Sequence, residues 1–280
     1  MIAPSNRFLA VGSGARVHPV WRVIPVVLVA SFSTLTVVRY WFDSDPYPPG
    51  LDGAQWLSYG RALFGGTARG AESTYAPLIP ALAHGLSLAL GPFLGLRVLA
   101  VTLLAVLALA VGLLAVRVLG LTWGSLTAAL VLPSTAMAEP FYYGGYPQQA
   151  ALAFGLLGIV GLLRANCARS ASNQIRAFAL VAICLILASA SHLLFGPLLL
   201  LSAALVALAM AMARDDGCSF MLCAAATVAP AAAVSIFVWL SYSGHGYSAP
   251  LEVTQRTLRV AWIYATRESP WLWAAIVVGG

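Results

Sequence analysis

Long apolar stretches separated by short polar segments dominate this chain. Once flanking residues are counted, seven stretches approach the roughly 20 residues that a bilayer-spanning helix needs. A chain inside a bilayer must satisfy its backbone hydrogen bonds internally, so each stretch is predicted to be an α-helix. The pattern predicts an all-α integral membrane protein, a single domain over residues 1–280 with about seven transmembrane helices. The stretches are 23–40, 98–116, 121–138, 150–163, 177–191, 193–213 and 220–240.

The first apolar stretch follows a polar segment that contains Arg7, Arg16 and Arg22. Such a basic segment also begins a secretory signal peptide, but here the apolar run continues past the candidate cleavage site at Ala30. We therefore expect an uncleaved first helix. Arginines are enriched on the cytoplasmic side of membrane proteins, so the N-terminus is expected in the cytoplasm.

The loop after this helix, residues 41–97, is predicted to contain two helices that lie on the outer membrane surface. The first covers 53–64. Its start is marked by Asp52 as a helix-capping residue with Gln55 three positions later, which is the spacing of a capping box. Its partial apolar stripe suits a helix lying flat at the interface.

The second surface helix is predicted over 75–90, an apolar segment too short to identify a crossing without further information. If it lies on the outer surface, the cytoplasmic segments hold eight arginines and two acids, whereas the outer segments hold seven of each. The opposite arrangement would export the loop 164–176 with its three arginines, against the positive-inside rule. We therefore predict seven crossings in a bacterial plasma membrane.

The end of the chain shows a second outer loop, 242–270, followed by ten mostly apolar residues, 271–280. At a rise of about 1.5 Å per residue, ten residues reach only about 15 Å, half of a bilayer. This predicts a truncated eighth helix, and we expect the chain to be the N-terminal part of a longer protein.

Composition agrees with a membrane protein: 61% of the residues are hydrophobic and 9% are charged, compared with about 25% charged in soluble domains. The net charge of +6 is not gathered into a basic and aromatic cluster, so nucleic acid is not an expected partner. The four cysteines lack metal-ligand spacing and are expected to be buried small hydrophobic residues without disulfides: Cys167, Cys184, Cys218 and Cys223.

No Asp, Glu, Arg or His falls in the middle of a predicted crossing. Ion-coupled transporters keep ionisable groups at their coupling site inside the bilayer. Their absence makes a transporter the least favoured function. The ionisable and polar residues are instead predicted to gather at the outer surface, where a lipid headgroup would bind and react.

Several motifs follow the first predicted helix. They are an acid shortly after that helix, the run Asp52, Trp56, Leu57 and Arg61, the run Tyr75, Pro77 and Leu78, and Arg97 near the start of the next helix. Together they resemble the GT-C glycosyltransferases, which include protein mannosyltransferases and aminoarabinose transferases. The resemblance covers roughly residues 20–200. It implies a membrane enzyme that transfers a sugar from a polyprenyl-phosphate donor to an acceptor outside the cytoplasm.

Candidate catalytic residues are Asp52, Asp45 and Asp43, because the resemblance implies that a carboxylate of the first outer loop does the chemistry. Glycosyl transfer needs a base to take the proton of the acceptor hydroxyl. Each residue also has a structural interpretation, Asp52 as a helix cap and the other two in turns before Pro46. Paired outer acids could instead bind a divalent metal ion, the one cofactor considered, although no metal-ligand set is assigned.

Candidate substrate-binding residues are cations for the donor phosphate and rings or polar groups for the sugar. Two of the groups have structural alternatives: the run 141–147 suits an aromatic belt with a tight turn, and His192 suits a satisfied interfacial histidine. The candidates are Trp56, Arg61, Glu72, Tyr75, Arg97, Tyr143, Tyr146 and His192, with Arg256 and Arg259 as further phosphate ligands.

The main alternative function is a non-catalytic or truncated membrane subunit that keeps the same scaffold and acts by binding. The expected partners are the lipid bilayer and a polyprenyl-phosphate-linked sugar.

Overall fold

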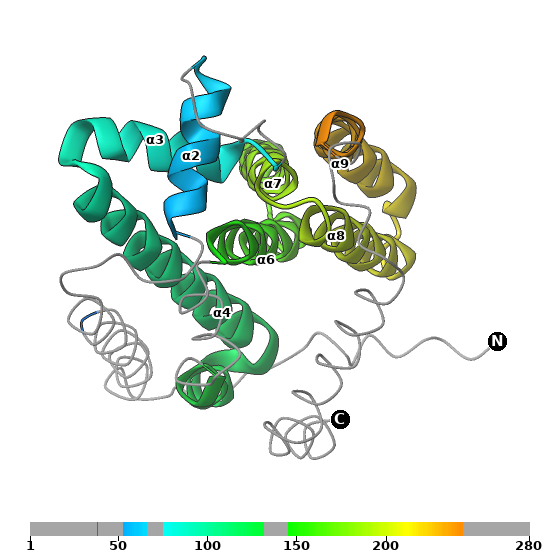
Figure 1. Ribbon diagram of the computed structural model, residues 1–280. Coiled ribbons are helices and arrows are strands. Elements are labelled where there is room, and N and C mark those ends of the chain that lie inside the picture. The colour runs from blue at the N-terminus through cyan, green and yellow to red at the C-terminus, as the bar shows by residue number, and fades with distance from the viewer. Residues whose placement is uncertain (1–37, 39–52, 66–74, 132–144, 243–280) are drawn as a thin grey trace, which may run out of the picture.

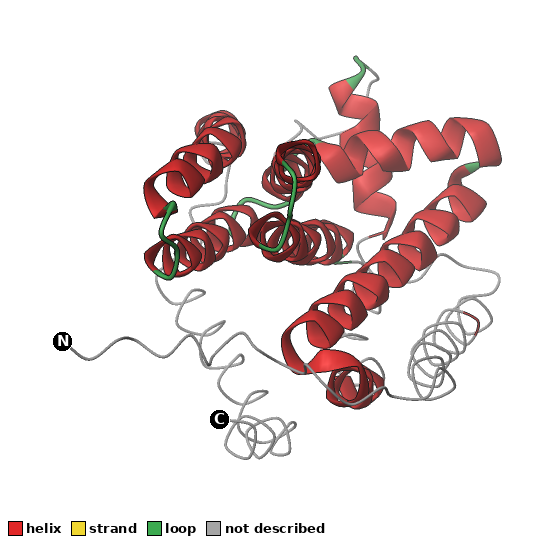
Figure 2. Ribbon diagram, turned by 180° about the vertical axis from the view of Figure 1, so that it is seen from behind, coloured by secondary structure: helices red, strands yellow, loops and turns green. Residues whose placement is uncertain are grey.

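The computed structural model of the protein describes Val38 and residues 53–65, 75–131 and 145–242 (Figure 1). Within these ranges all regular structure is helical and no strand occurs (Figure 2). The helices are α2 (Gly53–Leu63), α3 (Leu78–Leu90), α4 (Pro92–Val131), α6 (Tyr146–Asn166), α7 (Ala171–Ser191), α8 (Phe195–Met212) and α9 (Gly217–Tyr242).

Five of these helices, α4 and α6 to α9, are long and apolar enough to cross a membrane. This confirms the prediction of an all-α membrane protein for the described part of the chain. The predicted first crossing, 23–40, and the predicted truncated helix, 271–280, lie outside the described residues. Seven crossings therefore remain a prediction.

Gly120 divides α4 into two helical segments of different direction. Its φ of 77° and ψ of 175° are not helical, and a positive φ of this kind is readily adopted by glycine alone. Beyond the break, Gly124 lies so close to the backbone of Ala115 and Val116 that a Cβ would collide with it. The sequence pattern predicted two separate apolar runs on either side of this position, and the second segment begins at Leu121, as predicted.

Small residues along α6 let its neighbours approach closely. A Cβ at Gly158 would lie 3.0 Å from Leu185 of α7, and one at Gly155 would lie 2.6 Å from Leu199 of α8. Within a bilayer, helix association depends on close van der Waals packing of this kind, because lipid is as apolar as the side chains. The core of the bundle therefore forms around α6.

α2 and α3 lie across one end of this bundle. In Figure 1, where α6 and α7 are seen close to end-on, both short helices run across the view, and α3 contacts α4, α6 and α7. Helices were predicted over 53–64 and 75–90; α2 matches to within one residue, and α3 begins three residues later than predicted, at Leu78. α3 has only 13 residues, or about 20 Å, too short to cross a bilayer unaided. Its position at the membrane surface remains a prediction.

The contact between α2 and α3 depends on Gly60. A Cβ at this position would collide with the carbonyl oxygen of Pro80 and lie 2.7 Å from the Cβ of His84. Glycine therefore allows the backbones of the two helices to touch.

Gly60→Ala should separate α2 from α3 and lower the free energy of unfolding by about 1–3 kcal/mol, the usual cost of overpacking. Thermal unfolding of the purified chain in detergent measures this. Gly85→Ala, in α3, is the matched control: its Cβ would meet nothing within 4 Å, and alanine should there be neutral or add up to about 1 kcal/mol. Equal effects of the two substitutions would contradict the packing argument.

The opposite end of the bundle is rich in arginine. Arg214 donates to both carboxylate oxygens of Asp216 and, through Nη1, to the main-chain and side-chain oxygens of Asn166 at 3.0 Å. The hydrogen bond from Arg214 holds the pKa of Asp216 below its usual value. These contacts join the segment after α8 to the end of α6. The described arginines at this end are Arg117, Arg164, Arg169, Arg176 and Arg214, against Arg61 and Arg97 at the other. The five arginines that the predicted topology assigns to the cytoplasm therefore lie at one end of the bundle, and the side of the membrane that this end faces stays a prediction.

The cysteines are only partly as expected. All four are free, which agrees with the absence of disulfides, but only Cys184 is buried. The prediction of burial is wrong for Cys167, Cys218 and Cys223, which are exposed. Cys167 follows the last residue of α6, while Cys218 and Cys223 lie on an outward face of α9. An apolar environment at such a face can come from lipid as well as from protein.

Candidate functional site

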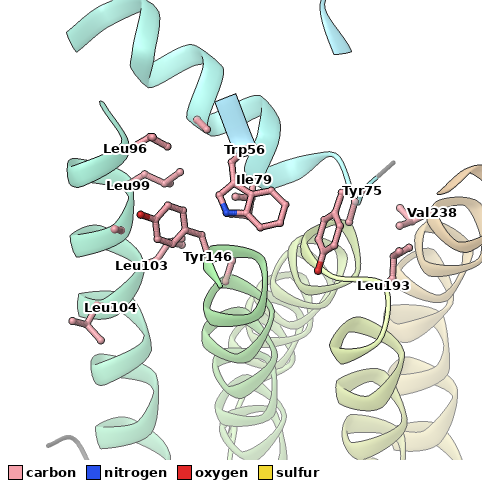
Figure 3. Packing of buried hydrophobic residues seen from close by; sticks show 14 residues of the cluster. Trp56, Tyr75, Ile79, Leu96, Leu99, Leu103, Leu104, Tyr146, Leu193 and Val238 are labelled. Carbon is pink, nitrogen blue, oxygen red and sulfur yellow. The ribbon is translucent and has the colours of Figure 1, made fainter. Parts of the chain in front are cut away.

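A buried cluster of apolar and aromatic side chains joins the bundle to α2 and α3, and we call it the cap cluster (Figure 3). Its members come from α2, the segment before α3, α3 itself, α4, α6, the α7–α8 connection and α9. Segments far apart in sequence therefore meet at one end of the protein. The labelled members are Trp56, Tyr75, Ile79, Leu96, Leu99, Leu103, Leu104, Tyr146, Leu193 and Val238.

Three of the predicted substrate-binding residues form a chain of ring contacts at this cluster. The Trp56 and Tyr75 rings meet edge to face with centroids 4.9 Å apart, and Tyr75 meets His192 in the same manner at 5.7 Å. Such arrangements are the favoured geometry of aromatic pairs. Each residue was a separate candidate in the sequence, and the fold brings them together.

His192 also caps the start of α8. Its Nδ1 accepts hydrogen bonds from the backbone N–H groups of Leu194 at 3.0 Å and Phe195 at 3.2 Å. An accepting Nδ1 carries no proton, so the neutral ring carries its proton on Nε2. Burial lowers the pKa of His192 to about 4. At neutral pH this side chain is therefore a hydrogen-bond donor through Nε2, not a cation.

The neutral His192 should make the protein less stable in acid. Between its ordinary pKa of 6.5 and the folded-state pKa of about 4, the unfolded chain binds the additional proton, so stability falls as the pH is lowered through this window. His192→Asn should keep the cap, because asparagine accepts the same backbone bonds, and should remove this part of the acid sensitivity. Melting temperatures from about pH 7 to pH 4 measure the difference.

The control for capping is His192→Ala, which should lose about 1 kcal/mol of stability at pH 7. If His192→Asn retains the full pH dependence of the wild type, another group is responsible for it.

Tyr146 is fully buried and belongs to the first turn of α6. The interpretation of 141–147 as an aromatic belt with a tight turn is therefore wrong for Tyr146 and Pro147, which are buried in the first turn of α6. Proline fits the first helical turn, where its missing N–H costs nothing, and the Tyr146 ring fills space beside α4. A Cβ on Gly53, the first residue of α2, would lie 3.7 Å from the Tyr146 hydroxyl.

The two described arginines at this end differ in position. Arg97 is half-buried on the second turn of α4 and directly follows Leu96 of the cap cluster. Arg61 is exposed in the last turn of α2. The fold therefore places Arg97 one residue after a leucine of the cap cluster, whereas Arg61 is exposed at the end of α2.

Seven candidates lie outside the described residues: Asp43, Asp45, Asp52, Glu72, Tyr143, Arg256 and Arg259. Asp52 is joined directly to Gly53, whose neighbours are Leu96 and the Tyr146 hydroxyl. In the described part of the chain, no three His, Cys, Asp or Glu residues lie close enough together to hold a metal ion.

One polar residue at this end was not singled out from the sequence. Gln149 of α6 has no exposed surface, and neither atom of its amide has a hydrogen-bond partner among the described residues. The sequence contains part of the signal, because Gln148 and Gln149 directly precede the apolar run that begins at Ala150. Which of the two is buried depends on the neighbouring helices.

The fold and this site define a helical integral membrane protein with an aromatic cluster at one end of its bundle. Comparison with protein-family models, with curated proteins and with solved structures finds no match.

Proposed function

We propose that this chain is a membrane glycosyltransferase of GT-C type, which transfers a sugar from a polyprenyl-phosphate donor to an acceptor hydroxyl on the non-cytoplasmic face. The observation that carries the proposal is the convergence of Trp56, Tyr75, Tyr146 and His192, from four separate segments, at one end of the bundle. All four are candidates for substrate binding on the sequence alone. The described arginines concentrate at the opposite end, which supports assigning this end to the outer face.

The chemistry assigns a role to each group. The acceptor oxygen attacks the anomeric carbon, the bond from that carbon to the phosphate oxygen breaks, and polyprenyl phosphate leaves. A carboxylate of the first outer loop takes the acceptor proton, with Asp52 as the first candidate because it directly precedes Gly53 at the start of α2. Arg97 is suited to the negative charge of the departing phosphate. The neutral His192 can donate from Nε2 to a sugar or phosphate oxygen.

The test uses the purified chain in proteoliposomes made with a membrane lipid extract whose lipid-linked sugars are radiolabelled. Transfer of label to a hydroxyl acceptor supports the proposal. Binding of the labelled lipid without any product would favour the non-catalytic subunit. Accumulation of label inside the vesicles without product would identify a transporter, and either of these results contradicts the transferase.

A further inference from the structure

Gln149 is a buried polar side chain in apolar surroundings, and no structural role for it is apparent among the described residues. It lies on the first turns of α6 and is fully buried, and neither its Nε2 nor its Oε1 has a hydrogen-bond partner within the described residues. Buried polar side chains in folded proteins almost always have a partner, and each exception calls for an explanation.

Several other buried polar groups of the bundle solve this problem locally, although Ser189 Oγ, like Gln149, has no partner among the described residues. Ser125, Ser191 and Thr227 each donate a hydrogen bond to the backbone carbonyl four residues earlier in their own helix, at 2.6–2.7 Å. A glutamine amide has two hydrogen-bonding ends, a donor and an acceptor. Both ends of Gln149 remain to be satisfied by something else.

The position of Gln149 on α6 follows from its neighbours along the helix. Residues three or four apart share a helix face. Tyr146, three residues before, packs with Leu96 to Leu104 of α4, and Ala153, four residues after, packs with Leu107 and Ala108 of α4. Gln149 therefore belongs to the α4-facing stripe of α6. Helical side chains lean toward the amino-terminal end, which brings the amide toward Tyr146 and the cap cluster.

The chemistry of the amide limits the class of ligand. A hydroxyl group both donates and accepts, so two sugar hydroxyls, or one alone, can satisfy both ends of Gln149. A phosphate only accepts, and it would leave Oε1 facing negative charge. The adjacent rings of Tyr146 and Trp56 offer apolar surface to the carbon face of a sugar.

We propose that Gln149, with Tyr146 beside it, forms a subsite that hydrogen-bonds hydroxyl groups of the sugar on the lipid-linked donor. This inference rests on the proposed transferase function and names a specificity-determining residue for it. Gly53, the first residue of α2, lies against the Tyr146 hydroxyl, so the first turn of α2 lies beside the cap-cluster end of this stripe. The sugar reaches Gln149 when that turn moves, as covering elements of enzymes commonly do.

The test compares two kinds of soluble probe on the full chain in detergent: farnesyl phosphate, and farnesyl phosphate esters of mannose, glucose, galactose and arabinose. With the wild type, one or more of the sugar esters should raise the melting temperature further than farnesyl phosphate does. Gln149→Leu should keep the rise produced by farnesyl phosphate and lose the additional rise from the sugar. In the transfer assay, this substitution should raise the KM for the donor about tenfold or more, as expected when a sugar hydroxyl loses its partner.

Gln148→Leu is the matched control. It changes the same residue type one position earlier, about 100° around the helix, where the side chain is half-exposed. It should retain the additional rise. If Gln149→Leu does not fold, Gln149→Met, which keeps an unbranched side chain of similar length, replaces it.

The outcomes distinguish failure of the Gln149 subsite from failure of the transferase function on which it rests. Retention of the full sugar-dependent rise by Gln149→Leu overturns the subsite while leaving the transferase in place, and it would assign the amide to a buried water. If the wild type responds to no probe and transfers no sugar, the proposed function itself fails, and the subsite fails with it.

Discussion

Asp52→Asn should lower the rate of sugar transfer by about 10²- to 10⁴-fold, the usual contribution of a catalytic base. Asparagine cannot take the proton of the acceptor hydroxyl. It is, however, as good a helix-capping residue as aspartate, so α2 should still begin at Gly53 and stability should change little. Initial rates of label transfer in proteoliposomes, with melting temperatures of the same preparations, measure both quantities.

The neighbouring acids provide the comparison for this experiment. Asp45→Asn and Asp43→Asn should each retain more activity than Asp52→Asn if Asp52 is the base. Full activity of all three variants would remove the catalytic role of the first outer loop. Loss of stability in Asp52→Ala together with full activity of Asp52→Asn would leave Asp52 as a helix cap only.

Trp56→Ala should lower the free energy of unfolding by about 3–5 kcal/mol, the typical cost of removing a large buried ring. The Trp56 side chain is only 5% exposed and lies against Tyr59 and Tyr75. Its loss should loosen α2 over the cap cluster and reduce sugar transfer as well. Thermal unfolding in detergent and the transfer assay measure these effects.

Trp123 supplies the matched control for removing a tryptophan. Its side chain is 70% exposed on the second segment of α4, and surface substitutions usually change stability by about 0.5 kcal/mol or less. Trp123→Ala should therefore behave nearly as the wild type. Trp56→Phe should recover much of the lost stability, because the ring contact with Tyr75 remains possible. An equal loss from both alanine substitutions would show that Trp56 has no special role in the cap cluster.

The helices could largely be predicted from the sequence, because the signals that define them are local. Apolar run length located α4 and α6 to α9, and Gly65 ends the segment that holds α2. Even the division of α4 at Gly120 was visible as two separate apolar runs. These features depend on nearby residues and on the bilayer, so no knowledge of the packing was needed.

The site was predictable only as a set of residue types. Trp56, Tyr75 and His192 could each be chosen separately, but their meeting depends on tertiary packing, and the contact of Tyr75 with His192 joins segments more than 100 residues apart. The capping role of His192 and the burial of Gln149 also follow from tertiary packing. Tyr146 and Pro147 were assigned to a turn because the preceding glycines signal one, and because the apolar pattern alone starts this helix at Ala150, whereas α6 begins at Tyr146.

The direct backbone contact at Gly60 has a mechanical consequence. With no side chain between them at that point, the backbones of α2 and α3 are in direct contact, and sliding one helix along the other would bring a larger residue into the place of Gly60. Any opening above the bundle is therefore expected to move α2 and α3 together as one rigid body, and not as two independent helices.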